Sequence, residues 1–131
     1  MSAVGFRRDD PRIAVLRLTK SGRLDRRFGK RLLRPGSHGG YAQAILVDRE
    51  GAVLVGGLAY DDSALDAAAW ALARFLPSGA LDRGFGRSGI VLSDFGTGAD
   101  WIGALAEQRD GKIVAGGEVY GDQALARYLP R

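Results

Sequence analysis

The chain of 131 residues contains no cysteine, a single methionine and a single histidine. The absence of cysteine excludes disulfides, thiolate nucleophiles and cysteine-ligated metal sites. No apolar run approaches the roughly 18 to 20 residues that cross a bilayer. The opening segment, MSAVGFRRDDPR, lacks the apolar stretch of a signal peptide. We therefore expect a soluble chain without a membrane span, and its cellular compartment stays open.

Lysine is also scarce: the chain has three lysines and 16 arginines. Its net charge is +4. A basic surface can attract nucleic acid or another polyanion. The arginines, however, often neighbour aspartates, as in RRDD and DRRF, and no basic block is interleaved with aromatic residues. We therefore do not expect nucleic acid as a partner.

The chain repeats itself. IAVLRLTKSGRLDRRFG (residues 13–29) and WALARFLPSGALDRGFG (residues 70–86) are identical at nine of 17 positions. A third copy begins with QALARYLPR at the end of the chain. A second element, YAQAILVDREGAVLVGGLAY (residues 41–60), recurs as WIGALAEQRDGKIVAGGEVY (residues 101–120). Two elements that recur in the same order indicate a repeat architecture.

Each repeat reads as short strands joined by turns. Asp110-Gly111 between two apolar runs is a hairpin signal, and Glu50-Gly51 occupies its place in the first copy. The stretch SALDAAAWALARF is interpreted as a loop and then a strand, because its sister IAVLRL is shorter and β-branched. The sequence predicts an all-β fold with about two β-propeller-type blades per chain, each a four-stranded antiparallel meander.

The repeat also suggests blade boundaries. RLLR in the first copy and IVLSDF in the second are expected to open a blade. The expected parts are an N-terminal tail (1–12), the outer strand and junction turn of a preceding or swapped blade (13–29), blade 1 (30–75), a junction turn (76–86) and blade 2 (87–131). Because a propeller closes with about four to eight blades, we expect a head-to-tail homo-oligomeric ring or a piece of a longer propeller.

Three motifs carry a family resemblance: LDRGFGRSGIVLSDF, AEQRDGKIVAGG and ALARYLP. In this order they resemble the delta-60 repeat family of bacterial proteins, over nearly all of residues 13–131. The resemblance implies a propeller-like fold, a bacterial and often secreted or surface context, and no common enzymatic activity. The first unit departs from the pattern, because FGKRLLRPG stands where FGxxG is expected.

The segment GFGRSG (residues 84–89) formally matches a dinucleotide-binding fingerprint. Such a loop should follow a strand and open a helix, whereas these glycines follow a turn and lead into a strand pattern. The sister segment RRFGKR keeps only Gly29. We therefore expect no cofactor, and interpret Gly86 as part of a turn between the outer strand of one blade and the inner strand of the next. Gly84 and Gly89 belong to one copy only, and we assign them local conformational freedom.

Several residues recur at equivalent places, and a structural role is favoured for them. A catalytic carboxylate is rarely duplicated in every blade, whereas a carboxylate that bonds turn amides or a neighbouring arginine is. The recurring structural positions are Arg17, Asp25, Gly29, Arg74, Asp82, Gly86 and Arg127. Four recurring aromatic residues are expected to pack between blades, with a binding surface as the alternative: Tyr41, Tyr60, Trp101 and Tyr120.

Two other sets of residues are candidates for chemical sites. His38 adjoins Ser37, but side chains one residue apart do not readily form a nucleophile–base pair, and one histidine falls short of a metal cluster. Acidic loop positions could supply oxygen ligands to Ca²⁺, although their spacing is not that of an EF-hand: Asp61, Asp62, Asp66, Asp94 and Asp100. We expect no metal site and no catalytic set.

The sequence thus favours a non-enzymatic propeller-like repeat module for assembly or partner binding. The alternative is a metal-dependent hydrolase with its site at the axis of an oligomeric propeller. There, one carboxylate per chain, such as Glu50 or Glu107, would surround a shared ion.

Overall fold

The structure is a computed structural model that describes residues 2–4, 11–60, 68–95, 98 and 100–129. Every regular element among these residues is a β-strand, and the strands form three antiparallel sheets. The N-terminal sheet comprises β1 (Ser2–Val4), β2 (Ile13–Leu16) and β3 (Lys30–Leu33). The central sheet comprises β4 (Gly40–Val47), β5 (Val53–Tyr60), β6 (Ala68–Phe75) and β7 (Ile90–Ser93). The C-terminal sheet comprises β8 (Trp101–Glu107), β9 (Ile113–Val119) and β10 (Asp122–Tyr128).

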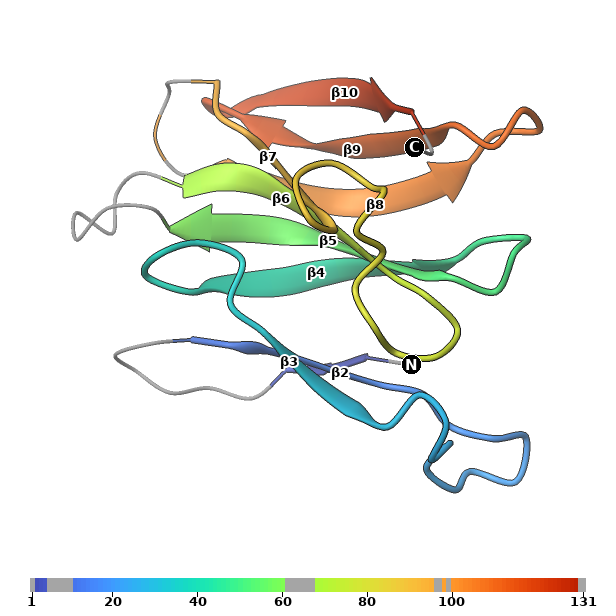
Figure 1. The fold of residues 1–131 in the computed structure, drawn as a ribbon. Coiled ribbons are helices and arrows are strands. Elements are labelled where there is room, and N and C mark those ends of the chain that lie inside the picture. The colour runs from blue at the N-terminus through green and yellow to red at the C-terminus, as the bar shows by residue number, and fades with distance from the viewer. Residues whose placement is uncertain (1, 5–10, 61–67, 96–97, 99, 130–131) are drawn as a thin grey trace.

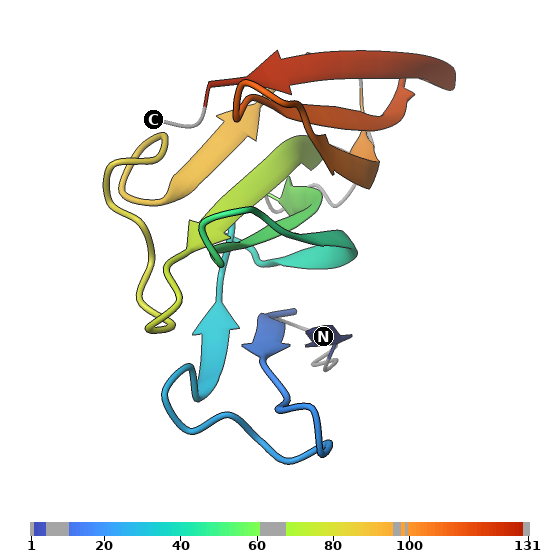
Figure 2. The same ribbon diagram turned by 90° about the vertical axis from the view of Figure 1, so that its right-hand side faces the viewer.

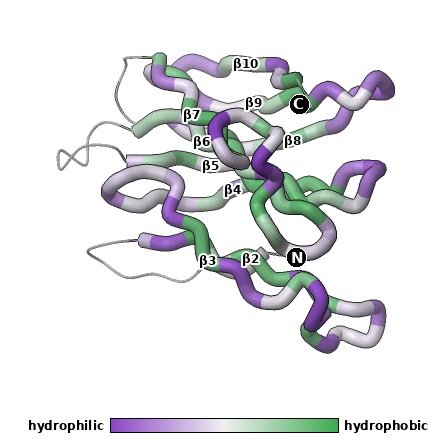
Figure 3. Tube along the Cα trace, in the orientation of Figure 1, coloured by the Kyte–Doolittle hydropathy of each residue, from purple (hydrophilic) through white to green (hydrophobic). Residues whose placement is uncertain are grey.

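The three sheets lie one above another, as Figures 1 and 2 show from two sides. Strands follow one another across each sheet in chain order, and the central sheet is a complete four-stranded meander. This arrangement confirms the predicted all-β fold with propeller-type meanders. Hydrophobic segments run along the strands of the central sheet, and hydrophilic segments occupy many of the turns (Figure 3).

The central sheet is buried on both faces because its strands alternate between two cores. Towards the N-terminal sheet, Val53, Val55 and Phe75 pack with Val15 and Phe28. Towards the C-terminal sheet, the packed residues are Leu54, Trp70, Leu72, Phe85, Ile102 and Ile113. Successive side chains of a strand point to opposite faces, so the apolar runs of β5 and β6 supply both cores.

The two hairpins predicted from the repeat are present. Gly51 joins β4 to β5 and Gly111 joins β8 to β9, with φ angles of 81° and 84°. Each hairpin also contains a register shift in its first strand, between Ala42 and Ala44 and between Ile102 and Ala104. The repeat therefore extends from sequence to backbone irregularities.

The strand that follows each Phe-Gly turn pairs differently from the prediction. β3 pairs with β2, and β7 pairs with β6, so each forms the last strand of the preceding sheet. The expected boundaries, with blade 1 at 30–75 and blade 2 at 87–131, placed these strands at the start of the following blade. The central sheet instead runs from Gly40 to Ser93. The return of the chain along the edge of β6 explains the difference, because the Asp82 amide donates to the Arg74 carbonyl at 2.9 Å.

The N-terminal segment also differs from the expected tail. Within residues 1–12, β1 pairs antiparallel with β2, and the Pro11 carbonyl accepts a hydrogen bond from the Gly40 amide at 2.9 Å. β2 therefore lies between two strands of its own chain. The loop expected before β6 falls on residues 61–67, outside the described residues, and β6 is a strand as predicted.

Candidate functional site

The GFGRSG segment is the turn that joins β6 to β7, so it lies within the central sheet rather than between two blades. Gly86 and Gly89 have φ angles of 53° and 98°, in the left-handed region that favours glycine. A Cβ atom at Gly86 would overlap the Ile90 carbonyl and the Val91 side chain. Among the described residues no helix follows the turn. The local geometry is therefore that of a strand return.

Gly86→Ala is expected to lower the free energy of unfolding by about 1–3 kcal/mol, because alanine there is strained and crowded. Gly84→Ala is the matched control: the nearest atom to its Cβ is an Asp82 carboxylate oxygen at 3.4 Å. We expect the control to change stability by less than about 0.5 kcal/mol. Urea denaturation of both variants measures the difference, and equal effects would contradict this role of Gly86.

A buried arginine lies at the end of β6. Arg74 is 3% exposed, and its guanidinium contacts Asp48 at 2.6 Å, Glu50 at 2.9 Å and Asp82. Burial acts to lower the pKa of Arg74, but the hydrogen bonds that its guanidinium donates to these carboxylates outweigh burial and raise the pKa above its ordinary value. Asp48 also accepts the Glu50 and Ala52 amides, at 2.9 Å each. The cluster ties the β4–β5 hairpin to the turn after β6.

The equivalent arginines have fewer partners. Arg17 contacts Asp25 at 3.5 Å, and both are partly exposed. Asp25 and Asp82 each accept an amide two residues later, from Arg27 at 3.0 Å and from Gly84 at 3.1 Å. Each aspartate thus contacts a turn amide and an arginine, and the structural role expected for these positions stays a prediction. Arg127 on β10 is exposed and forms no ion pair within 4 Å to another described residue.

The two hairpin turns contact each other across neighbouring sheets. The Arg49 amide donates to the Glu107 carboxylate at 3.0 Å, and the Arg49 side chain donates to the Gln108 carbonyl at 2.6 Å. Glu50 and Glu107, the carboxylates considered for a shared ion, are thus engaged with Arg74 and Arg49. Sequence comparison had not singled out Arg49 or Asp48, although Arg49 recurs as Arg109 at the same repeat position.

The recurring aromatic residues occupy different surroundings. Tyr41 and Tyr60 meet edge to face within the central sheet, with centroids 6.1 Å apart. Trp101 is half-buried and Tyr120 is exposed. Trp70 and Phe85 are the buried aromatic residues of the core between the central and C-terminal sheets, and neither is among the four recurring aromatic residues expected to pack between blades. The Nε1 of Trp70 also donates to the Glu118 carbonyl at 2.9 Å.

The Ser37–His38 pair and the acidic loop residues do not come together in one site among the described residues. Ser37 Oγ and His38 Nδ1 lie 3.0 Å apart, closer than expected for adjacent residues, in an exposed loop. Asp100 is buried and accepts the Tyr120 amide at 2.9 Å. Asp61, Asp62 and Asp66 lie outside the described residues. Within the part of the chain that the structure describes, no three acidic or histidine side chains gather as a metal site. No helix among these residues is suited to cross a membrane.

The outer face of the C-terminal sheet repeats a face that is buried in the central sheet. Leu54 and Leu72 are fully buried there, and the repeat aligns them with Val114 and Leu125. Leu125 is 80% exposed. It lines an open groove of about 560 Å³ together with Trp101, Gly103, Ala104, Gly116, Gly117, Glu118, Gln123 and Ala124.

The groove has a filled counterpart one sheet earlier. A Cβ atom at Gly56 would lie 2.8 Å from Ile102 Cγ2, so the absent side chain leaves room for Ile102 of the next sheet. Gly116 holds the position equivalent to Gly56, and its groove is open. The groove of the C-terminal sheet therefore corresponds to the place that Ile102 occupies on the central sheet.

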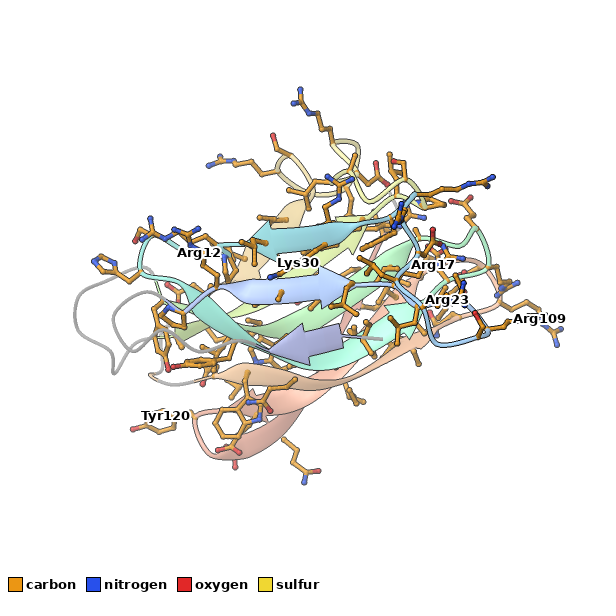
Figure 4. The ribbon with its side chains drawn as sticks, turned by 90° about the horizontal axis from the view of Figure 1, so that it is seen from below. Arg12, Arg17, Arg23, Lys30, Arg109 and Tyr120 are labelled. Atoms are coloured by element: carbon orange, nitrogen blue, oxygen red, sulfur yellow. The ribbon has the colours of Figure 1, made fainter. Side chains whose placement is uncertain are left out.

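The N-terminal sheet presents the opposite end of the stack. Leu33 packs into the core, whereas its neighbour Leu32 is 57% exposed. Residues 1–34 contain eleven lysine and arginine residues against three aspartates. More than half of the 19 lysine and arginine residues of the chain therefore lie in its N-terminal 34 residues. Arg12, Arg17, Arg23 and Lys30 lie on this side of the molecule (Figure 4).

The comparisons with known proteins concern the repeat itself. The family model described as "Domain of unknown function (DUF5122) beta-propeller" matches residues 51–85 and 108–130, somewhat less than half of the chain. No curated protein and no solved structure matches the chain. The two matched segments hold the hairpin turns and the strands that follow them. The chain therefore carries a propeller-like repeat in sequence as well as in topology.

Proposed function

We propose that this chain is a non-enzymatic repeat module of the delta-60 type that assembles head to tail with further copies of itself into a closed ring. The observation that carries the proposal is the exposed face of the C-terminal sheet, whose residues are buried at equivalent positions of the central sheet. Exposed apolar faces of this kind mark interaction sites. A head-to-tail contact joins unlike faces and closes when the rotation divides evenly.

The two ends of the stack supply the two faces of this contact. Leu125 and the groove over Gly116 lie on the C-terminal sheet, and Leu32 lies on the outer face of the N-terminal sheet. The basic residues of the N-terminal sheet would meet a C-terminal face that carries Glu118 in the groove. Contacts between two basic N-terminal faces would be repulsive, which favours the head-to-tail arrangement over that contact between like faces.

The side-chain chemistry supports a scaffold rather than an enzyme. The carboxylates of Asp48, Glu50, Asp82 and Glu107 are bound by Arg74 or Arg49 of the same chain. A general acid or base must instead reach a substrate proton. The recurring arginines and carboxylates thus hold turns in place.

Light scattering during size-exclusion chromatography tests the ring. We expect a mass that is a multiple of 13.9 kDa for the wild type, and a monomeric mass for Leu125→Asp and for Leu32→Asp. Val47→Asp is the matched control, because Val47 is 56% exposed but lies on the central sheet. The control should keep the wild-type mass. A monomeric wild type at high concentration would overturn the ring.

A further inference from the structure

β10 has an open edge where the equivalent β6 has a partner. β6 lies between β5 and β7, whereas β9 is the one neighbour of β10 among the described residues. The Arg74 amide donates to the Gly89 carbonyl at 3.0 Å, and the Arg74 carbonyl accepts the Asp82 amide. Alternate residues of a strand point their amides to the same side. The backbone groups of Gln123, Leu125 and Arg127 therefore face the open edge.

Arg127 on β10 also has fewer acidic partners than the equivalent Arg74 on β6. At the positions equivalent to Asp48 and Glu50, which hold Arg74, the repeat has Gln108 and Asp110. The pKa of Asp110 lies below its ordinary value, chiefly through its hydrogen bond with Lys112 and to a smaller extent through the charge of Arg127. The carboxylate that corresponds to Asp82 would come from a segment following β10. At Arg127 a neutral amide thus replaces one acidic partner, and no carboxylate among the described residues takes the place of Asp82.

The described residues also leave the apolar side chain of Leu125 uncovered. After β2 and after β6 the chain places a phenylalanine, Phe28 or Phe85, against the face that looks towards the next sheet. Both rings are almost fully buried, and Phe85 belongs to the same core as Leu72. Leu125 holds the place of Leu72 but is mostly exposed. A phenylalanine in the equivalent place would cover Leu125.

From these three features we infer that the β10 edge is a binding site for an extended segment that carries Leu-Asp-x-x-Phe-Gly followed by an apolar strand. Its strand pairs antiparallel with Gln123–Ala126, as β7 pairs with Trp70–Ala73. Its aspartate bonds to Arg127, and its phenylalanine packs on Leu125. Addition of a strand to an open sheet edge is a common mode of peptide recognition. Backbone hydrogen bonds then supply affinity, and pockets for the side chains supply specificity.

The inference rests on the proposed function only in its use of the incomplete C-terminal sheet. The two fail separately. A monomeric mass would overturn the ring without touching the edge site, whereas unselective peptide binding would overturn the edge site and leave the ring.

The test titrates the full chain with a fluorescent peptide of residues 77–93, PSGALDRGFGRSGIVLS, and follows anisotropy. Val91 lies opposite Leu72 in the ladder, so its amide faces β6, and the amide of Leu92 faces away. We expect saturable binding that N-methylation at Val91 weakens by at least about tenfold. N-methylation at Leu92 is the matched control and should leave the affinity unchanged.

A double-mutant cycle tests the charge contact. Asp82→Asn in the peptide should weaken binding to the wild-type chain by about fivefold, and should have no effect on binding to the Arg127→Gln chain. Arg127 is exposed, so the substitution is not expected to disturb folding. No saturable binding, equal losses for the two N-methylated peptides, or the same loss on both chains would each overturn the inference.

Discussion

Replacement of Arg74 by leucine is expected to lower the free energy of unfolding by about 3–5 kcal/mol, because breaking a buried charge cluster leaves uncompensated charges behind. Asp48 and Asp82 are almost as buried as Arg74 itself. Without the guanidinium, the two carboxylates lose their shared counter-charge in a site with little water. Urea denaturation followed by circular dichroism measures the change.

The repeat supplies a matched control for this substitution. Arg17→Leu removes the equivalent arginine, but its contact with Asp25 is longer and partly exposed. Exposed ion pairs contribute about 0–1 kcal/mol, so we expect a loss of that size. Asp82→Ala should also lower the melting temperature, by less than Arg74→Leu, because Asp48 and Glu50 remain. Equal losses at Arg17 and Arg74 would show that burial of the cluster does not determine its contribution.

Trp70→Ala is expected to cost about 3–5 kcal/mol, the range typical of a large aromatic side chain removed from a core. Trp70 has no exposed surface and packs in the core between the central and C-terminal sheets. Its ring meets Phe95 edge to face at 5.4 Å between centroids. Its loss would leave a cavity at the contact that holds the two sheets together.

Two further variants test the role of Trp70: Trp70→Phe separates packing from hydrogen bonding, and Trp101→Ala is a control at a second tryptophan. Trp70→Phe keeps much of the ring but loses the hydrogen bond from Nε1 to the Glu118 carbonyl, which adds about 1 kcal/mol to the cost of the smaller ring. Trp101→Ala removes the half-buried tryptophan of the open groove and should cost less than Trp70→Ala. A larger loss at Trp101 than at Trp70 would contradict the assignment of Trp70 to the core contact.

The repeat in the sequence was sufficient to predict the fold class and both hairpins. Gly51 and Gly111 stand between apolar runs at the same offset, and local turn chemistry determines such hairpins. β6 was predicted in spite of its alanines, because the sister strand β2 is β-branched. These predictions succeeded because each depended on neighbouring residues along the chain.

The local sequence, which predicts the hairpins, does not determine which strand β7 pairs with. A strand between two meanders can join either one without any change in sequence order. Its choice depends on the return of the chain along β6, where Asp82 bonds to Arg74 through both backbone and side chain. The repeat identifies the arginine and the aspartate as structural positions, but their identity alone does not show that the chain returns along the edge of β6.

The sequence also reveals only some of the residues that form the buried contacts. Asp48 completes the Arg74 cluster but is replaced by Gln108 in the next copy, so a search for identical repeat positions passes over it. Trp70 aligns with Ile13 and Gln123 and therefore does not recur as an aromatic residue. Asp48 and Trp70 therefore lie at positions where the copies differ, and a comparison of identical repeat positions does not reveal them.

The turns before β3 and β7 differ in length. Lys30 follows Gly29 directly, whereas three residues separate Gly86 from Ile90, and both strands still start opposite equivalent residues, Leu16 and Ala73. Natural variation in loop length without a change in strand register identifies a place that accepts inserted sequence. The segment after Gly86 is therefore where an epitope tag or a reporter peptide can be grafted into this scaffold while the sheets on either side keep their pairing.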